Sequence, residues 1–174
     1  MGKKIIIIGN GGTGKSTLGA KLSKVLGIPV HHLDLLTFTE DGGHVGETVF
    51  RKHLTEILST DSWIVEGWSY QSTLAERIAA ADTIIYLDYP IWFSYWNALK
   101  RNIYSIFRRD KYSPVASLWR RSRQIIKAMW LVHTVYEPQA RTMLKAMGKK
   151  YYYHFMNRKD LKKKVKGWEL GIRS

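Results

Sequence analysis

The sequence predicts one α/β domain in which helices pack against a parallel sheet. Three observations support this fold class: short apolar runs rich in β-branched residues, amphipathic stretches that alternate with them, and a length of 174 residues, which suits one domain. The predicted strands are Ile5–Ile8, Val30–Leu33, Ser62–Val65, Thr83–Asp88 and Lys150–Phe155.

The first strand runs directly into a glycine-rich loop. Gly9–Ser16 fits G-x-x-x-x-G-K-[ST] at every fixed position, and an amphipathic helix is predicted over Lys15–Leu26. Glycines let several N–H groups converge at a helix N-terminus, which favours a polyphosphate; the alternative is a turn with an incidental lysine. Lys15 would contact the β- and γ-phosphates of the bound polyphosphate, and the Ser16 hydroxyl would bind Mg²⁺. The predicted nucleotide-binding residues are Gly9, Asn10, Gly11, Gly12, Thr13, Gly14, Lys15, Ser16 and Thr17.

Two carboxylates follow the second and third predicted strands. Since ligands bind at the carboxyl ends of parallel strands, Asp34 is expected to orient a substrate hydroxyl or a magnesium-bound water, with helix capping as the alternative. Glu66 is expected to hold Mg²⁺ through water or to accept a proton from the attacking hydroxyl, unless it only caps a helix or pairs with a lysine. The adjacent His31 and His32 point to opposite faces of a strand, so they are interpreted as structural.

Several stretches between the strands are predicted to be loops or helices. Thr37–Glu47 lacks periodicity and indicates a loop, and Thr48–Leu58 has a helical apolar stripe, so the two together suggest an insert that covers the substrate. Another helix is predicted over Ser69–Ala81, and a further one over Pro138–Met147.

A long helix is predicted after Pro90, which suits a first helical turn. One face of it carries an aromatic and aliphatic stripe, which is expected to be core, with a base-stacking platform as the alternative. The stripe consists of Trp92, Trp96, Leu99, Ile103 and Phe107.

Basic residues gather at the end of this helix and at the start of the next one, which is predicted over Ser117–Leu131. Guanidinium groups bind phosphate oxygens bidentately and stabilise charge during phosphoryl transfer, so residues 101–123 are predicted to form a lid. Arg101 and Arg120 are the candidate catalytic residues of this lid. The basic residues are Lys100, Arg101, Arg108, Arg109, Arg120, Arg121 and Arg123.

The net charge of +14 is concentrated in the second part of the chain. Residues 1–99 carry 8 Lys and Arg against 10 Asp and Glu, whereas residues 100–174 carry 20 against 4, a net +16. This asymmetry favours an anionic partner, either a polyphosphate or a nucleic-acid backbone, although a solvated basic surface is the alternative. No cysteine and no apolar run long enough to span a bilayer is present, so a reducing, cytoplasmic location is expected.

A polar tetrapeptide follows the last predicted strand and precedes a lysine-rich terminal helix. Asn157–Asp160 superficially resembles the guanine-reading N-K-x-D of GTPases, but Arg158 occupies the lysine position and no D-x-x-G occurs in the middle of the chain. Asn157 and Arg158 are therefore expected to form one edge of a pocket for the nucleotide base.

Taken together, these features resemble the small P-loop kinases related to adenylate and shikimate kinases. Within that group the chain looks most similar to the family called DNA topology modulation proteins (FlaR-type). The likeness covers roughly residues 3–109 and rests on Ile8–Leu18, His32–Asp34, Trp63–Gly67, Thr73–Leu74, Arg77, Ala81–Asp88 and Lys100–Arg101.

The resemblance implies a P-loop NTPase fold, three-layer α/β/α, with a five-stranded parallel sheet of order 2-3-1-4-5. It also implies ATP and Mg²⁺ at the glycine loop, transfer of the γ-phosphoryl group to a small acceptor, Asp34 and Glu66 at the acceptor and magnesium positions, and lid arginines from residues 101–123. An ATP-dependent regulator that binds DNA through the basic part is the alternative, and the chain is expected to be a monomer or a homodimer.

The sequence departs from both enzyme patterns at the acceptor side. Adenylate kinases have Asp-Gly-x-Pro-Arg where this chain has Glu66–Tyr70, and shikimate kinases have Asp-x-Asp where Asp34 is followed by two leucines. Neither AMP nor shikimate is therefore supported as the acceptor.

Overall fold

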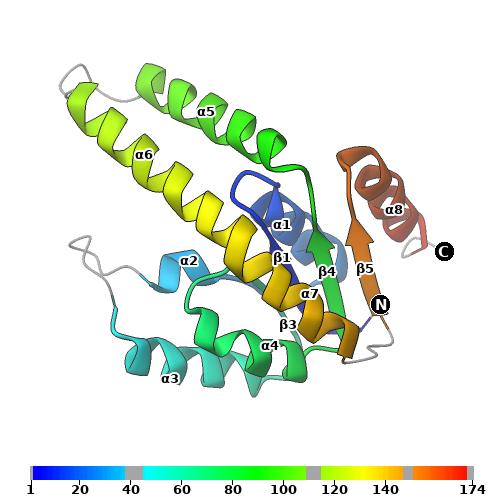
Figure 1. The fold of residues 1–174 in the computed structure, drawn as a ribbon. Helices are drawn as coiled ribbons and strands as arrows, with labels where there is room; N and C mark the ends of the chain where they lie inside the picture. The colour runs from blue at the N-terminus through cyan, green and yellow to red at the C-terminus, as the bar shows by residue number, and fades with distance from the viewer. Residues whose placement is uncertain (1, 38–44, 109–114, 147–150, 172–174) are drawn as a thin grey trace.

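A five-stranded parallel sheet forms the centre of the protein (Figure 1). The computed structural model describes residues 2–37, 45–108, 115–146 and 151–171, without the side chains of residues 101–122, 146, 170 and 171. The order β2-β3-β1-β4-β5 confirms the expected order and puts β1 at the middle. The strands are β1 (Lys4–Gly9), β2 (Val30–His32), β3 (Trp63–Glu66), β4 (Thr83–Leu87) and β5 (Tyr151–Phe155).

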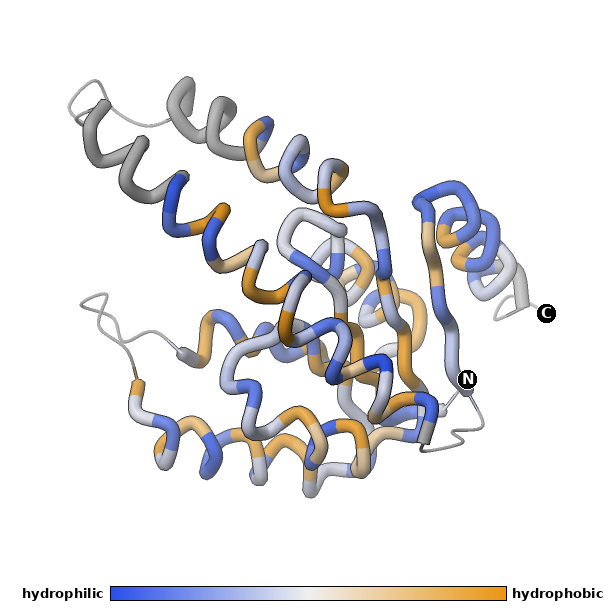
Figure 2. Tube along the Cα trace, in the orientation of Figure 1, coloured by the Kyte–Doolittle hydropathy of each residue, from blue (hydrophilic) through white to orange (hydrophobic). Residues whose placement is uncertain are grey.

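Helices cover both faces of this sheet, which confirms the three-layer arrangement. Successive strand residues point to opposite faces, so Ile5 and Ile7 pack with α1 (Lys15–Leu26) and α8 (Arg158–Gly171). Ile6 and Ile8 belong to the other cluster, which includes side chains of α3 (Glu47–Leu58), α4 (Leu74–Ala80) and α7 (Glu137–Ala146). Figure 2 shows apolar strands at the centre and polar segments outside them.

Some helix boundaries differ from the sequence-based expectations. The second strand ends at His32, and Asp34 lies in the short helix α2 (Leu33–Leu36) rather than just beyond the strand. The helix expected over Ser69–Ala81 begins late, because a 3₁₀ turn, Gln71–Thr73, precedes α4.

The helices that follow β4 are more continuous than expected. Helix α5 spans Ile91–Arg108 and α6 spans Val115–Leu131. A π-helical segment, Val132–Tyr136, then joins α6 to α7 without a break. Such segments occur frequently at functional sites.

The expectation that the stripe on α5 is core was wrong for its described side chains. Trp92 is 67% exposed, Trp96 54% and Leu99 50%, whereas the small residues Ser94 and Ala98 are buried. The reason is close packing, because a Cβ added to Gly12 of the glycine loop would lie 2.8 Å from the Ser94 carbonyl oxygen. An indole ring does not fit between backbones this close. Ile103 and Phe107 lie among the side chains that are not described.

Candidate active site

The glycine loop has the backbone conformation that its sequence predicts. Gly9, Gly12 and Gly14 have φ of 147°, 74° and 93°, in the region that favours glycine. A Cβ on Gly9 would lie 2.5 Å from the Leu87 carbonyl oxygen, so this position also has no room for a side chain. Gly14 is the N-cap of α1, and the N-terminal N–H groups of this helix are therefore available to an anion.

Lys15 and Thr13 both turn toward the carbonyl group of Asn10. The Lys15 Nζ donates to this oxygen at 3.0 Å, and the Thr13 Oγ1 donates to it at 2.7 Å. Lys15 is 8% exposed, which is rare for a lysine. The loop therefore holds the lysine ammonium in a buried position beside the end of β1.

The Glu66 carboxylate contacts polar side chains from two other elements, at the carboxyl ends of the strands. Its Oε1 accepts a hydrogen bond from the Ser16 hydroxyl at 2.8 Å and lies 2.6 Å from the His32 Nδ1. Its Oε2 is buried and has no hydrogen-bond partner among the described residues. A buried carboxylate oxygen without a partner costs free energy, and a hydroxyl beside a carboxylate is a donor set that suits Mg²⁺.

The contact of His32 with Glu66 was not anticipated, since both histidines were interpreted as structural. His32 is paired in register with Glu66 across β2 and β3, so the two side chains lie on the same face. In the structure each residue ends its own strand, whereas the predicted strands end at Leu33 and Val65. Only the strand order and the register turn this coincidence into a contact.

The Asp34 carboxyl lies close to the backbone that follows β3. Gly67 has φ of 114°, and a Cβ on it would lie 3.0 Å from the Asp34 Oδ1, so glycine leaves room for the carboxylate. Although the residue as a whole is exposed, partial desolvation of its carboxyl group raises the pKa of Asp34. Nearby Lys15 opposes this rise, nearby Glu66 adds to it, and the Ser69 N–H opposes it by hydrogen bonding. The structure thus brings Lys15, Asp34 and Glu66 into one electrostatic group.

A buried arginine shapes this backbone. Arg77 is fully buried and donates to the carbonyl oxygens of Gly67 at 3.0 Å and Trp68 at 2.8 Å. Burial lowers the pKa of Arg77 to about 10, while the charge of Asp34 acts in the opposite direction. The Trp68 Nε1 in turn donates to the Gly9 carbonyl at 2.7 Å, so the segments after β3 and β1 are tied together.

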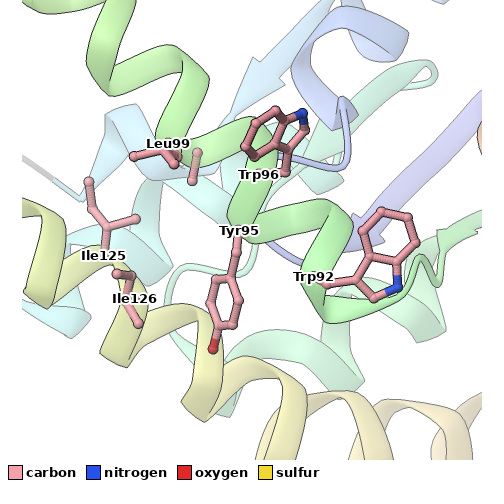
Figure 3. A pocket seen from close by; sticks show the side chains of 7 residues that line it. Trp92, Tyr95, Trp96, Leu99, Ile125 and Ile126 are labelled. Carbon is pink, nitrogen blue, oxygen red and sulfur yellow. The ribbon is translucent and has the colours of Figure 1, made fainter.

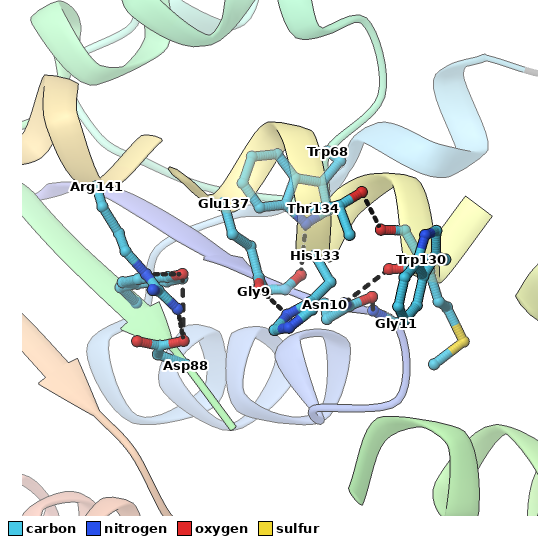
Figure 4. A network of polar contacts seen from close by, with 12 residues as sticks. Gly9, Asn10, Gly11, Trp68, Asp88, Trp130, His133, Thr134, Glu137 and Arg141 are labelled. Atoms are coloured by element: carbon cyan, nitrogen blue, oxygen red, sulfur yellow. Dashed lines mark hydrogen bonds and ion pairs between the residues drawn. The ribbon is translucent and has the colours of Figure 1, made fainter. Parts of the chain in front are cut away.

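The glycine loop is also fastened to the two helices that carry the predicted lid. The Asn97 Nδ2 on α5 donates to the Gly12 carbonyl at 3.0 Å. The Asn10 Nδ2, labelled in Figure 4, donates to the Met129 carbonyl on α6 at 3.0 Å. Asn10 also accepts from the Gly11 N–H through its Oδ1 at 2.7 Å. Both helices therefore contact the loop.

The side chains of Arg101 and Arg120 lie outside the described residues, and their roles stay predictions.

Figure 4 also shows a second polar network beside the loop, built on the end of β4. Asp88 accepts from the Arg141 Nη2 at 2.6 Å, and its other oxygen lies 2.8 Å from the His154 Nε2. On the π-helical segment, His133 contacts the buried Glu137 at 2.9 Å. Arg141 thereby links α7 to the sheet, while His133 and Glu137 link the π-helical segment to α7.

A pocket of about 470 Å³ lies between α1 and α8, next to the glycine loop. Arg158 is among its lining residues, and Asn157 is not. Asn157 caps α8 instead, since its Oδ1 accepts from the Asp160 N–H at 3.0 Å and its Nδ2 donates to the Asp160 carboxylate at 2.7 Å. The lining residues are Thr13, Gly14, Thr17, Leu18, Lys21, Arg158, Leu161, Lys162, Val165, Lys166 and Glu169.

Strand order, glycine loop and following helix together define the P-loop kinase fold. No family model and no curated protein matches the chain. Among solved structures it is similar to the shikimate kinase from Acinetobacter baumannii in complex with shikimate, with 19% identity, a TM-score of 0.56, and coverage of 98% of this chain and 94% of that one.

Two further structures give the same picture. The shikimate kinase from Bacteroides thetaiotaomicron has 17% identity, a TM-score of 0.53 and coverage of 98% of both chains. TT1252 from Thermus thermophilus has 16% identity, a TM-score of 0.53 and coverage of 96% of both chains. Likeness at such low identity establishes the fold. The resemblance to topology modulation proteins, DNA binding and the oligomeric state stay predictions. Within the described residues, no helix combines the length and apolarity that crossing a membrane requires.

Proposed function

We propose that the protein is an ATP-dependent phosphotransferase that moves the γ-phosphoryl group of ATP to a small acceptor. The observation that carries this proposal is the buried Glu66 carboxylate, which bonds the Ser16 hydroxyl and has one oxygen without a described partner. It lies beside the glycine loop that buries Lys15. A magnesium–triphosphate site needs these three groups together.

The donor nucleotide would lie along the glycine loop, with its base in the pocket between α1 and α8. Its phosphates would be bound by N–H groups at the start of α1, and the Lys15 ammonium would exchange the Asn10 carbonyl for phosphate oxygens. The apolar side chains of Leu18, Leu161 and Val165 suit a base, and Arg158 lies at the same pocket.

Ser16 and Glu66 would hold Mg²⁺, whose chemistry is to neutralise charge on the β- and γ-phosphates. His32 would orient the Glu66 carboxylate through its ring nitrogen, as partners of metal-binding carboxylates commonly do. The pair of Ser16 and Glu66 therefore serves in the free protein as a preformed metal site.

Asp34 would orient the acceptor hydroxyl and accept its proton. Its raised pKa suits this role, because a stronger base takes the proton more readily once the carboxyl is ionised. Arg101 and Arg120 would stabilise charge on the transferred group from the lid. Arg77 is a positioning residue, since it holds the backbone around Gly67 against which Asp34 lies.

The test is ATP binding and γ-phosphoryl transfer across a panel of hydroxyl-bearing metabolites and nucleoside monophosphates. Lys15→Ala is expected to reduce transfer by about a hundredfold or more and to weaken ATP binding, because phosphate charge loses its buried counterion. Lys24→Ala is the matched control on an exposed turn of the same helix and is expected to leave both unchanged. Unchanged ATP affinity in Lys15→Ala would contradict the proposal.

A further inference from the structure

Helices α5 and α6 form an apolar groove that the proposed reaction does not use (Figure 3). The groove has a volume of about 360 Å³ and lies between two helices that run side by side. Indole, phenol and aliphatic groups line it, and Trp92 and Trp96 project from α5 at its edge. The lining residues are Trp92, Tyr95, Trp96, Ala98, Leu99, Ile125 and Ile126.

Exposed apolar side chains continue along α6 beyond the groove. Trp130, which follows the groove residue Ile126 by four positions and therefore lies on the same side of α6, is 57% exposed, and Ile126 is 49% exposed. Soluble proteins rarely leave contiguous apolar surface of this kind uncovered unless a partner binds there. Aromatic residues, tryptophan above all, are also the residues that contribute most at protein interfaces.

The charge around the groove selects the kind of partner. Among the described side chains of α5 and α6, the charged residues are Lys100, Arg123 and Lys127, and all three are basic and exposed. The Lys100 Nζ lies 5.1 Å from the centre of the Trp96 ring. A second copy of this chain would bring like charges together, whereas an acidic partner is attracted.

The shape of the groove favours a helix as the occupant. A hollow between two helices accepts the ridge of apolar side chains on a third, whereas a bilayer surface is flat. The aliphatic side chains of Leu99, Ile125 and Ile126 offer no hydrogen-bonding group to the edge of a nucleotide base. We propose that this groove binds an amphipathic helix of a partner protein, with its apolar stripe in the groove and its acidic side chains toward Lys100, Arg123 and Lys127.

The experiment measures binding of synthetic helices to the full chain by fluorescence anisotropy at physiological salt. The probe is a labelled 18-residue peptide with leucines at helical spacing and glutamates elsewhere, and the control peptide has lysines in place of the glutamates. The acidic peptide is expected to bind saturably, and the basic one at least about tenfold more weakly. Ile126→Asp is expected to weaken binding of the acidic peptide by about tenfold or more, while Gln124→Asp, which makes the same charge change outside the groove, has less than about a twofold effect.

Two further probes separate this partner from others. Phosphatidylglycerol vesicles and a labelled oligothymidylate are titrated against the parent protein, Ile126→Asp and Gln124→Asp. The proposal is overturned if Ile126→Asp weakens binding of the vesicles or of the oligothymidylate, Gln124→Asp does not, and binding of the acidic peptide is unchanged in both variants. It is also overturned if Ile126→Asp and Gln124→Asp weaken the acidic peptide equally. ATP takes no part in these titrations, so their outcome is independent of the proposed reaction.

Discussion

The glycine loop and the α5–α6 pair contact each other, yet the sequence predicts them with different success. The conformation of the loop depends on a backbone requirement, positive φ at Gly12 and Gly14, which few residue types other than glycine satisfy. On α5, the aromatic stripe had the spacing of a buried face, but Trp92 and Trp96 are exposed. Helical spacing identifies which side chains share a face. Only the neighbouring structure decides whether that face is buried.

The largest expected effect concerns Asp34, at the sheet edge beside the loop. Asp34→Asn is expected to lower the rate of phosphoryl transfer by about a hundredfold, because the amide cannot take the proton from the hydroxyl group of the substrate that receives the phosphoryl group. The acid limb of the parent rate profile is expected above the ordinary aspartate pKa, since partial desolvation raises the pKa of this carboxyl. Initial rates across the pH range check both points, and an unchanged acid limb in Asp34→Asn would refute the role.

The same substitution, which is expected to lower activity, is expected to raise the stability of the folded protein at neutral pH. Because the pKa of Asp34 is higher in the folded state, ionisation costs stability as the pH rises from the unfolded-state value through the raised folded-state value. Asp34→Asn is therefore expected to match the parent near about pH 3 and to be more stable near about pH 7. Denaturant titrations at both pH values measure this, and a variant less stable at the higher pH would count against the raised pKa.

The next effect tests the contact between loop and helix. Gly12→Ala is expected to cost about 2 kcal/mol, because it combines an unfavourable positive φ with a Cβ too close to the Ser94 carbonyl. Gly27→Ala, also at positive φ but with no atom within 4 Å of an added Cβ, is expected to cost about 1 kcal/mol. Urea unfolding compares the two, and equal costs would mean that α5 does not press on the loop.

The smallest effect is expected for the exposed stripe on α5, and the buried stripe on α1 provides the contrast. Trp96→Ala on α5 is expected to change the free energy of unfolding by less than about 1 kcal/mol, since the side chain is mostly exposed. Leu22→Ala on α1, where the side chain is 1% exposed, is expected to cost about 3 kcal/mol. Thermal unfolding of both variants provides the comparison. A large loss in Trp96→Ala would show that the α5 stripe supports the core after all.

Much of the fold was accessible from the sequence, because alternating strands and helices restrict a chain of this length to few topologies. The proximity of Glu66 to the glycine loop was accessible as well, because the carboxyl ends of parallel strands lie on the same side of a sheet. The roles of Lys15, Ser16 and Glu66 stay predictions. The contact between His32 and Glu66 was not accessible, because it depends on the register between two short strands. Nor was the role of Asn157, whose side chain caps α8 while its neighbour Arg158 lines the pocket.

The central claim is that Glu66 at the end of β3 and Ser16 of the glycine loop together form a magnesium site. Calorimetric titration of ATP with and without Mg²⁺ tests this claim without knowledge of the acceptor. Glu66→Gln should remove most of the gain in ATP affinity that Mg²⁺ provides, by about tenfold or more, while Glu56→Gln on the exposed side of α3 should retain it. If Glu66→Gln responds to Mg²⁺ as the parent does, the carboxylate is not at a metal site and the account is wrong.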